Sequence, residues 1–205
     1  MKQVKKQKQV QPTDKKAEES LTYTVEVRDK EGRVIQRVSA PSRSYVEQWN
    51  QLVNVQASQA NKTIKDTGGV NRTIIPHASN FGYVSGIGDD YMGIVVGKGT
   101  TAVAIDDYAL ESQCVEGTGI DEFNHQATTL TLPAVVGPTS SFTARRILIN
   151  NSGASISGIR EIGAYMVGYD TVVKFFLAFR DVLPSAVYVP HGGSITVTYT
   201  IAATV

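Results

Sequence analysis

The sequence predicts a mainly β protein, a β-sandwich of the jelly-roll or immunoglobulin-like kind, with one or two short helices and an extended N-terminal arm. Residues 194–201 alternate apolar and hydroxylated side chains, which is the period of a half-buried strand. Residues 172–179 form a nearly continuous apolar run, typical of a central strand covered on both faces. The chain also contains 18 glycines, which fits a β fold with many turns.

Length and composition predict one domain. A chain of 205 residues, 41% hydrophobic and 19% charged, is long enough to bury one sizeable core. We expect a flexible arm over residues 1–20 and a single β-rich domain over 21–205. Within that domain we expect a hairpin plus helix (21–60), a long loop (61–83) and the sandwich body (84–205).

The arm is basic and has almost no apolar residue besides Val4 and Val10, so it cannot offset its ordering entropy alone. We expect it to order against a neighbouring subunit, by adding a strand or filling a groove. A solvated tail is the simplest alternative. Contact with nucleic acid through phosphate attraction is another, which the lack of aromatic residues disfavours. The lysines of this assembly arm are Lys2, Lys5, Lys6, Lys8, Lys15 and Lys16.

The first elements of the domain are a hairpin and a helix. Residues 21–27 alternate in polarity and pair with 33–38 across a turn, and Pro41 closes the hairpin. Ser44 and Glu47 stand at capping-box spacing before apolar residues at helical intervals. The spacing predicts a helix over residues 44–56.

The middle of the chain predicts loops and short strands. Residues 57–83 are polar and broken by glycine and proline, with one strand at 70–75, and so long a loop typically lies across a neighbour. Residues 91–96 form the next strand. Asp106 or Asp107 then caps a short helix ending near Cys114, and a strand over 128–136 is bent at Pro133.

The last third supplies the clearest strands. Tight turns join them, since Pro184 and Pro190 cannot continue a ladder and the glycines of the Pro-His-Gly-Gly sequence at 190–193 supply positive φ. We expect Phe176 in the core. The predicted strands are 142–149, 162–167, 172–179 and 194–201.

No motif predicts catalysis, a cofactor or a metal. The glycine-rich run 93–100 departs from a phosphate loop in its spacing and has Gly99 where Ser or Thr must bind magnesium, so we interpret it as a turn leaving a strand. The pairs Asp89–Asp90 and Asp106–Asp107 lack the further oxygens of a calcium loop and suit turns and helix caps.

The histidine and cysteine residues also predict neither a metal site nor a catalytic site. His77, His125 and His191 lie far apart, and Cys114 has no second cysteine at ligand spacing, which disfavours a zinc site. Cys114 and His125 are conceivable as a nucleophile pair, but a buried core cysteine is the more common case. We therefore expect a protein that is not an enzyme and has no small-molecule substrate.

Several sequence blocks from residue 84 onward form a recognisable pattern: residues 150–155, 161–163, 180–183 and 193–201, with 96–101 and 106–110 upstream. Together these blocks resemble a family of tailed-bacteriophage virion proteins. The resemblance implies a structural subunit of the head, neck or tail, made in the host cytoplasm, whose partners are its own copies and other virion proteins. No apolar stretch has the length of a membrane span, so we expect no membrane association.

A fibre or host-recognition module that binds surface glycan is the alternative function. Aromatic side chains at a strand end can stack on sugars, and Tyr165 and Tyr169 stand near Gly163 and Gly168. These two tyrosines are the candidate surface-recognition residues.

Overall fold

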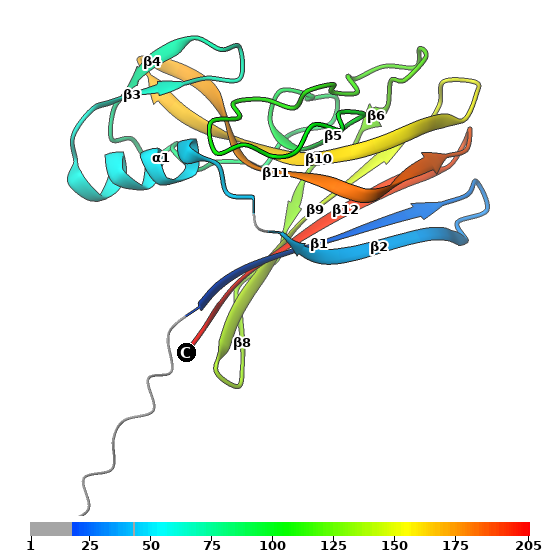
Figure 1. Cartoon of the computed structure of the whole chain (residues 1–205), viewed down its shortest axis with the longest axis horizontal. Helices are drawn as coiled ribbons and strands as arrows, with labels where there is room; N and C mark the ends of the chain where they lie inside the picture. The colour runs from blue at the N-terminus through cyan, green and yellow to red at the C-terminus, as the bar shows by residue number, and fades with distance from the viewer. Residues whose placement is uncertain (1–17, 43) are drawn as a thin grey trace, which may run out of the picture.

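The computed structural model describes residues 18–42 and 44–205 (Figure 1). The predicted mainly β fold is confirmed: two antiparallel sheets face each other across one core. The lysines of the predicted arm lie outside the described residues, and the described strand β1 begins at Glu18, inside the range predicted for that arm. Among the described residues, no helix combines the length and apolar character needed to cross a membrane.

The larger sheet has the strand order β2-β1-β12-β9, and three short strands pair in turn along the other side of β9. Its strands are β1 (Glu18–Arg28), β2 (Val34–Ser42), β6 (Asn124–His125), β7 (Thr129–Leu130), β8 (Ala134–Val136), β9 (Thr139–Ile149) and β12 (Ser194–Thr204). The smaller sheet has the order β11-β10-β5. Its strands are β5 (Gly93–Gly97), β10 (Ile156–Asp170) and β11 (Val172–Val189).

The core lies between the inner faces of the two sheets. Tyr23 of β1 pairs in register with Tyr199 of β12, and both rings are buried. The Tyr199 ring meets Phe179 of β11 with 4.5 Å between centroids, and its hydroxyl donates to Asp181. Phe176 is fully buried, as predicted.

Helix α1 (Glu47–Ser58) covers β11 through the buried side chains of Leu52 and Val55. It begins three residues later than predicted, and the capping box was wrong. Val46 is the N-cap residue, and no side chain caps the helix. The Oγ of Ser44 lies 2.7 Å from that of Ser42, while the Glu47 amide donates to the carbonyl of Ile105. A neighbouring loop therefore satisfies this amide of the first turn.

The predicted long loop contains a second hairpin. The strand expected at 70–75 is β4 (Asn71–Ile74), and its partner β3 (Lys62–Lys65) was missed because it is short and polar. Asp66 shapes the turn, since its carboxylate accepts from the amides of Gly68 and Val70. Side-chain capping of this kind specifies a turn without an apolar pattern.

The short helix predicted after Asp107 is absent, and residues 98–123 form irregular chain with isolated β-bridges. The carboxylate of Asp107 accepts from the Ala104 amide and pairs with Arg180, so it closes a turn. Cys114 is buried, as predicted.

Prolines were tolerated in strands where we expected breaks. Pro41 pairs with Thr22 inside β2, which is an edge strand and so tolerates a missing amide donor. Pro184 lies within β11, where the register with β10 is irregular. Strand β11 is not the central strand that its apolar run predicted: it lies at the edge of the smaller sheet, and α1 packs against it.

Candidate interaction surface

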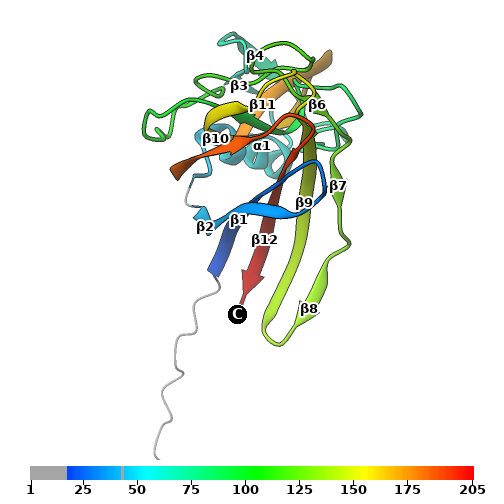
Figure 2. The same cartoon turned by 90° about the vertical axis from the view of Figure 1, so that its right-hand side faces the viewer.

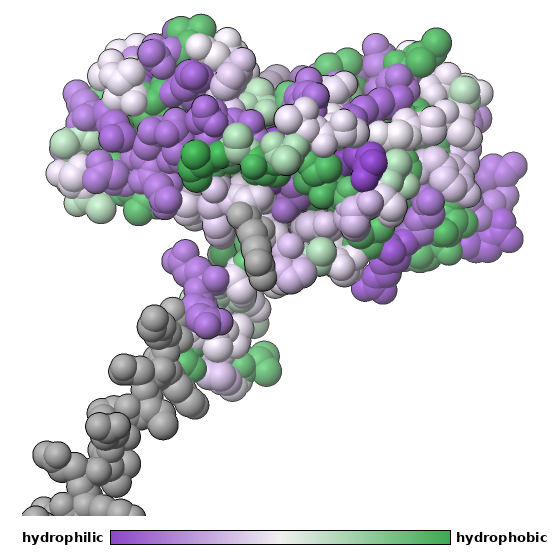
Figure 3. All heavy atoms as spheres, in the orientation of Figure 1, coloured by the Kyte–Doolittle hydropathy of each residue, from purple (hydrophilic) through white to green (hydrophobic). Residues whose placement is uncertain are grey.

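The larger sheet continues beyond the part that the smaller sheet and α1 cover. In Figures 1 and 2 the ends of β1, β12, β9 and β8 project together from the body, and the C-terminus lies among them. We call residues 18–20, 132–142 and 201–205 the extended end. Figure 3 shows apolar residues at the surface of this projection.

Strand register shows that the extended end prolongs the apolar inner face of the sandwich. Tyr23, Tyr199 and Ala144 form a buried row across the sheet. The next row outward is Leu21, Ile201 and Phe142, of which the last two are partly exposed. The outermost row consists of Glu19, Ala203, Ser140 and Val135. Val135 is 75% exposed, so the inner face runs two rows past its cover.

An apolar groove of about 260 Å³ lies where this uncovered face meets the start of α1. Tyr45 and Trp49 form one wall, with 5.1 Å between their ring centroids, and Glu19 stands on the sheet side. The other residues that line the groove are Pro133, Ser140, Phe142, Ile201, Ala202 and Ala203.

The opposite face of the extended end is largely hydroxylated. Thr139 and Thr204 pair in register there, and their Oγ1 atoms are 2.9 Å apart. An antiparallel sheet with one polar face needs cover only on the other. The inner face is thus the one that lacks a layer.

The outer edge of the extended end also lacks a partner. Strand β8 pairs only with β9 among the described strands. Leu132, which precedes this strand, and Val136, its last residue, are 88% and 78% exposed. Proteins usually protect such edges with charge, yet residues 127–144 contain no charged side chain. Large exposed apolar patches mark interaction sites. The uncharged run 127–144 is the sequence signal that would have identified the extended end as such a site.

The blocks that carry the family resemblance meet in a buried polar network. Glu161 accepts from the amides of Gly99, Glu111 and Ser112 and from Arg180 Nε. The glycine-rich turn therefore surrounds a carboxylate rather than a phosphate. Gly97 permits the close approach, since a Cβ there would lie 2.5 Å from the Ser112 carbonyl oxygen.

A second network joins the other block of the resemblance. The Asn150 amide nitrogen donates to the carbonyls of Ala154 and Val189, each at 2.8 Å, while its oxygen accepts from Ser152. Asn150 is fully buried. These residues hold the loops together and leave no group facing a ligand.

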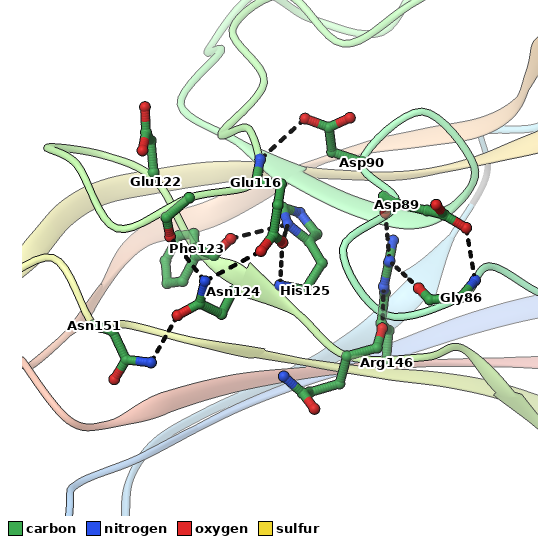
Figure 4. Close-up of polar contacts among 12 residues, drawn as sticks. Gly86, Asp89, Asp90, Glu116, Glu122, Phe123, Asn124, His125, Arg146 and Asn151 are labelled. Carbon is green, nitrogen blue, oxygen red and sulfur yellow. Dashed lines mark hydrogen bonds and ion pairs between the residues drawn. The ribbon is translucent and has the colours of Figure 1, made fainter.

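Arg146 organises a third network, which the sequence did not reveal (Figure 4). Its buried guanidinium donates to five backbone carbonyls, and burial lowers its pKa to about 10. The acceptors are the carbonyls of Gly86, Asp89, Met92, Ile94 and Gln126. Arg146 thus ties β9 to the segment leading into β5.

His125 lies in the same region, and Nδ1 is 3.0 Å from Glu116 Oε2. Its ring is buried, and Nε2 has no partner among the described residues. Burial, with the charge of Arg146, lowers the pKa of His125. No hydrogen bond joins it to Cys114 within the described part of the chain, and burial raises the pKa of that thiol to about 11. This is the opposite of an activated nucleophile.

The two candidate recognition tyrosines have different positions. Tyr165 is only 3% exposed, and its hydroxyl accepts from the Leu110 amide, so surface recognition was wrong for this residue. It is buried in a small cluster separate from the main core, with Val46, Val95, Leu110 and Leu177. Tyr169 is partly exposed, with its ring stacked on His77 at 3.8 Å between centroids.

The other candidates for site chemistry have structural partners. Asp89 accepts from the Gly86 amide and Asp90 from the Glu116 amide. In residues 18–42 and 44–205, no group of three His, Cys, Asp or Glu side chains is placed to hold a metal ion.

Comparison with known proteins found no matching family model, curated protein or solved structure.

Proposed function

We propose that this chain is a non-enzymatic structural subunit of a tailed-phage virion, which joins copies of itself and neighbouring head, neck or tail proteins through its extended end. The observation that carries the proposal is the apolar inner face that continues past its cover. A monomer that leaves this face in water forgoes the free energy of burying it, about 25 cal/mol per Å². Association recovers that energy.

The resemblance to virion proteins supports this role. Most of the residues that carry the resemblance serve the internal networks of the fold. The residues that face outward at the extended end are suited to contact with protein. These residues are apolar or hydroxylated, and they are uncharged apart from Glu18 and Glu19 at one margin. Such a surface does not favour nucleic acid, since phosphate binding needs Lys or Arg.

The exposed tip tests the assembly role. We expect Leu132→Asp combined with Val136→Asp to shift the purified chain toward monomer in light scattering, with an unchanged melting temperature. The matched control is Ile120→Asp, which alters a side chain that is 88% exposed in the distant loop and should leave association unchanged. A wild-type chain that is monomeric at all accessible concentrations would contradict the role.

Virion membership is tested separately. Phage particles whose genome encodes this chain should contain it in fixed copy number by mass spectrometry after density-gradient purification. Antibodies to the folded domain should label intact particles in electron micrographs. Particles free of the chain would overturn the proposal even if the purified protein associates.

A further inference from the structure

We propose that the groove at the extended end receives the N-terminal segment of a neighbouring copy, with residues 2–10 lying across the uncovered inner face. The inference rests on the proposed function and names the occupant of its surface. Three observations support it: the charge of the two parts, the residue pattern of the segment and the place where it joins the domain.

Charge divides the chain into two complementary parts. Residues 1–17 contain six lysines and one aspartate, a formal charge of +5. Since the whole chain carries +1, residues 18–205 carry −4. One acid, Glu19, stands at the groove itself, on its sheet side. Complementary charge steers such partners together and selects against wrong ones.

The residue pattern of the segment suits a groove that is apolar with an acidic margin. In an extended chain alternate residues share one face, which places Val4 and Val10 together with Lys2, Lys6 and Lys8. The valines supply the apolar contacts. Lysine methylenes can cover aromatic rings such as Tyr45 and Trp49 while their ammonium groups reach carboxylates.

The place where the segment joins the domain favours a neighbour over the same copy. Strand β1 begins at Glu18, opposite Thr204 at the end of β12, and Glu19 already lines the groove. Residues before Glu18 must reverse direction at once to enter their own groove. Extended, 17 residues span about 55 Å, enough to reach a second copy. Exchange of an identical segment between copies is a common route to assembly.

Cross-linking in the full-length protein tests the contact. Two single variants, Val4→Cys and Ala203→Cys, are mixed, one of them isotope-labelled, and oxidised at assembly concentration. We expect a disulfide between position 4 of one copy and position 203 of the other, identified by mass spectrometry. Cys114 stays silent because it is buried. The matched control replaces Ala203→Cys by Ile120→Cys, which is exposed but distant from the groove.

The double variant Val4→Cys with Ala203→Cys distinguishes the source of the segment. Cross-linked dimers and larger species support exchange between copies. A cross-link confined to single chains overturns it in favour of self-coverage. Absence of the 4–203 cross-link, or an equal yield with Ile120→Cys, overturns the contact altogether. The tip variant Leu132→Asp with Val136→Asp remains the test of assembly, so either idea can fail without the other.

Charge reversal tests the electrostatic part. We expect Glu19→Lys in the Ala203→Cys partner to lower the cross-link yield severalfold, and Lys6→Glu with Lys8→Glu in the Val4→Cys partner to restore it. High salt should lower the wild-type yield, because it screens exposed charges. A cross-link yield that stays the same under all three changes would contradict electrostatic recognition of the groove by this segment.

Discussion

Glu161 and Arg180 form an ion pair closed to solvent, with 2.5 Å between Oε1 and Nε and exposed side-chain fractions of 0% and 2%. Glu161 belongs to β10 and Arg180 to β11. The turns at Gly99 and Ser112 lie against this pair, and their backbone amides donate hydrogen bonds to the Glu161 carboxylate. The pair therefore holds irregular chain against the smaller sheet.

Breaking this pair should be costly. We expect Glu161→Gln to lower the free energy of unfolding by about 3 to 5 kcal/mol, because it leaves a buried guanidinium with less negative charge around it. Urea unfolding monitored by tryptophan fluorescence measures the change. The control is Arg33→Gln, which removes an exposed pair with Asp29 and should leave stability nearly unchanged. Equal effects of the two substitutions would refute a structural role for the buried pair.

Gln48 offers a stabilising substitution. Its amide is fully buried on α1, and neither Oε1 nor Nε2 has a partner among the described residues. We expect Gln48→Leu to raise the free energy of unfolding by about 1 to 3 kcal/mol, since the cost of an unmade hydrogen bond disappears. Thermal melting checks this, with Asn54→Leu on the exposed side of the same helix as control. A lower melting temperature for Gln48→Leu would show that the amide has a partner.

His125 should make the fold sensitive to acid. Its pKa is lowered in the folded chain, so the unfolded chain binds more protons below its own pKa of about 6.5. Stability is then complete above that pH and falls as pH decreases, by up to about 1.4 kcal/mol per unit. Unfolding curves between pH 8 and pH 5 should show a steeper loss for wild type than for His125→Asn. Parallel curves would contradict the assignment.

Cys114 should be inert in the folded chain. Burial raises the pKa of its thiol to about 11, so little thiolate exists near neutral pH. A chromogenic disulfide reagent at pH 8 should react slowly with native protein and with one thiol per chain in urea. Because the folded pKa lies above the unfolded one, this group also lowers stability as pH rises above about 8.5. Rapid stoichiometric reaction of the native protein would disprove its burial.

The strands were predictable wherever residues alternate along a half-buried sheet, as in β1 and β12. Their two-residue period is local, so the sequence alone carries it. The edge position of β11 was not predictable from its apolar run. Such a run indicates that the strand is buried, but it does not show which elements cover the strand or whether it has a neighbouring strand on each side. Here the cover on one side is α1 rather than a strand.

The candidate surface was harder to predict than the fold. Phe142 and Ile201 continue the apolar pattern of β9 and β12 with no sign in the sequence of where the second layer stops. The networks of Arg146 and Arg180 also escaped prediction, because they join residues more than fifty positions apart. Only the uncharged run 127–144 gave a local signal.

Glu18 pairs in register with Thr204, so both ends of the folded domain leave from the same place. A purification tag fused after Val205 would stand beside the groove and compete sterically with whatever covers it. Recombinant material tagged there could look monomeric for that reason alone. A circular permutant that links the two ends and opens the exposed turn at Gly32 would move both termini to the far end of β1, where a tag no longer stands beside the groove.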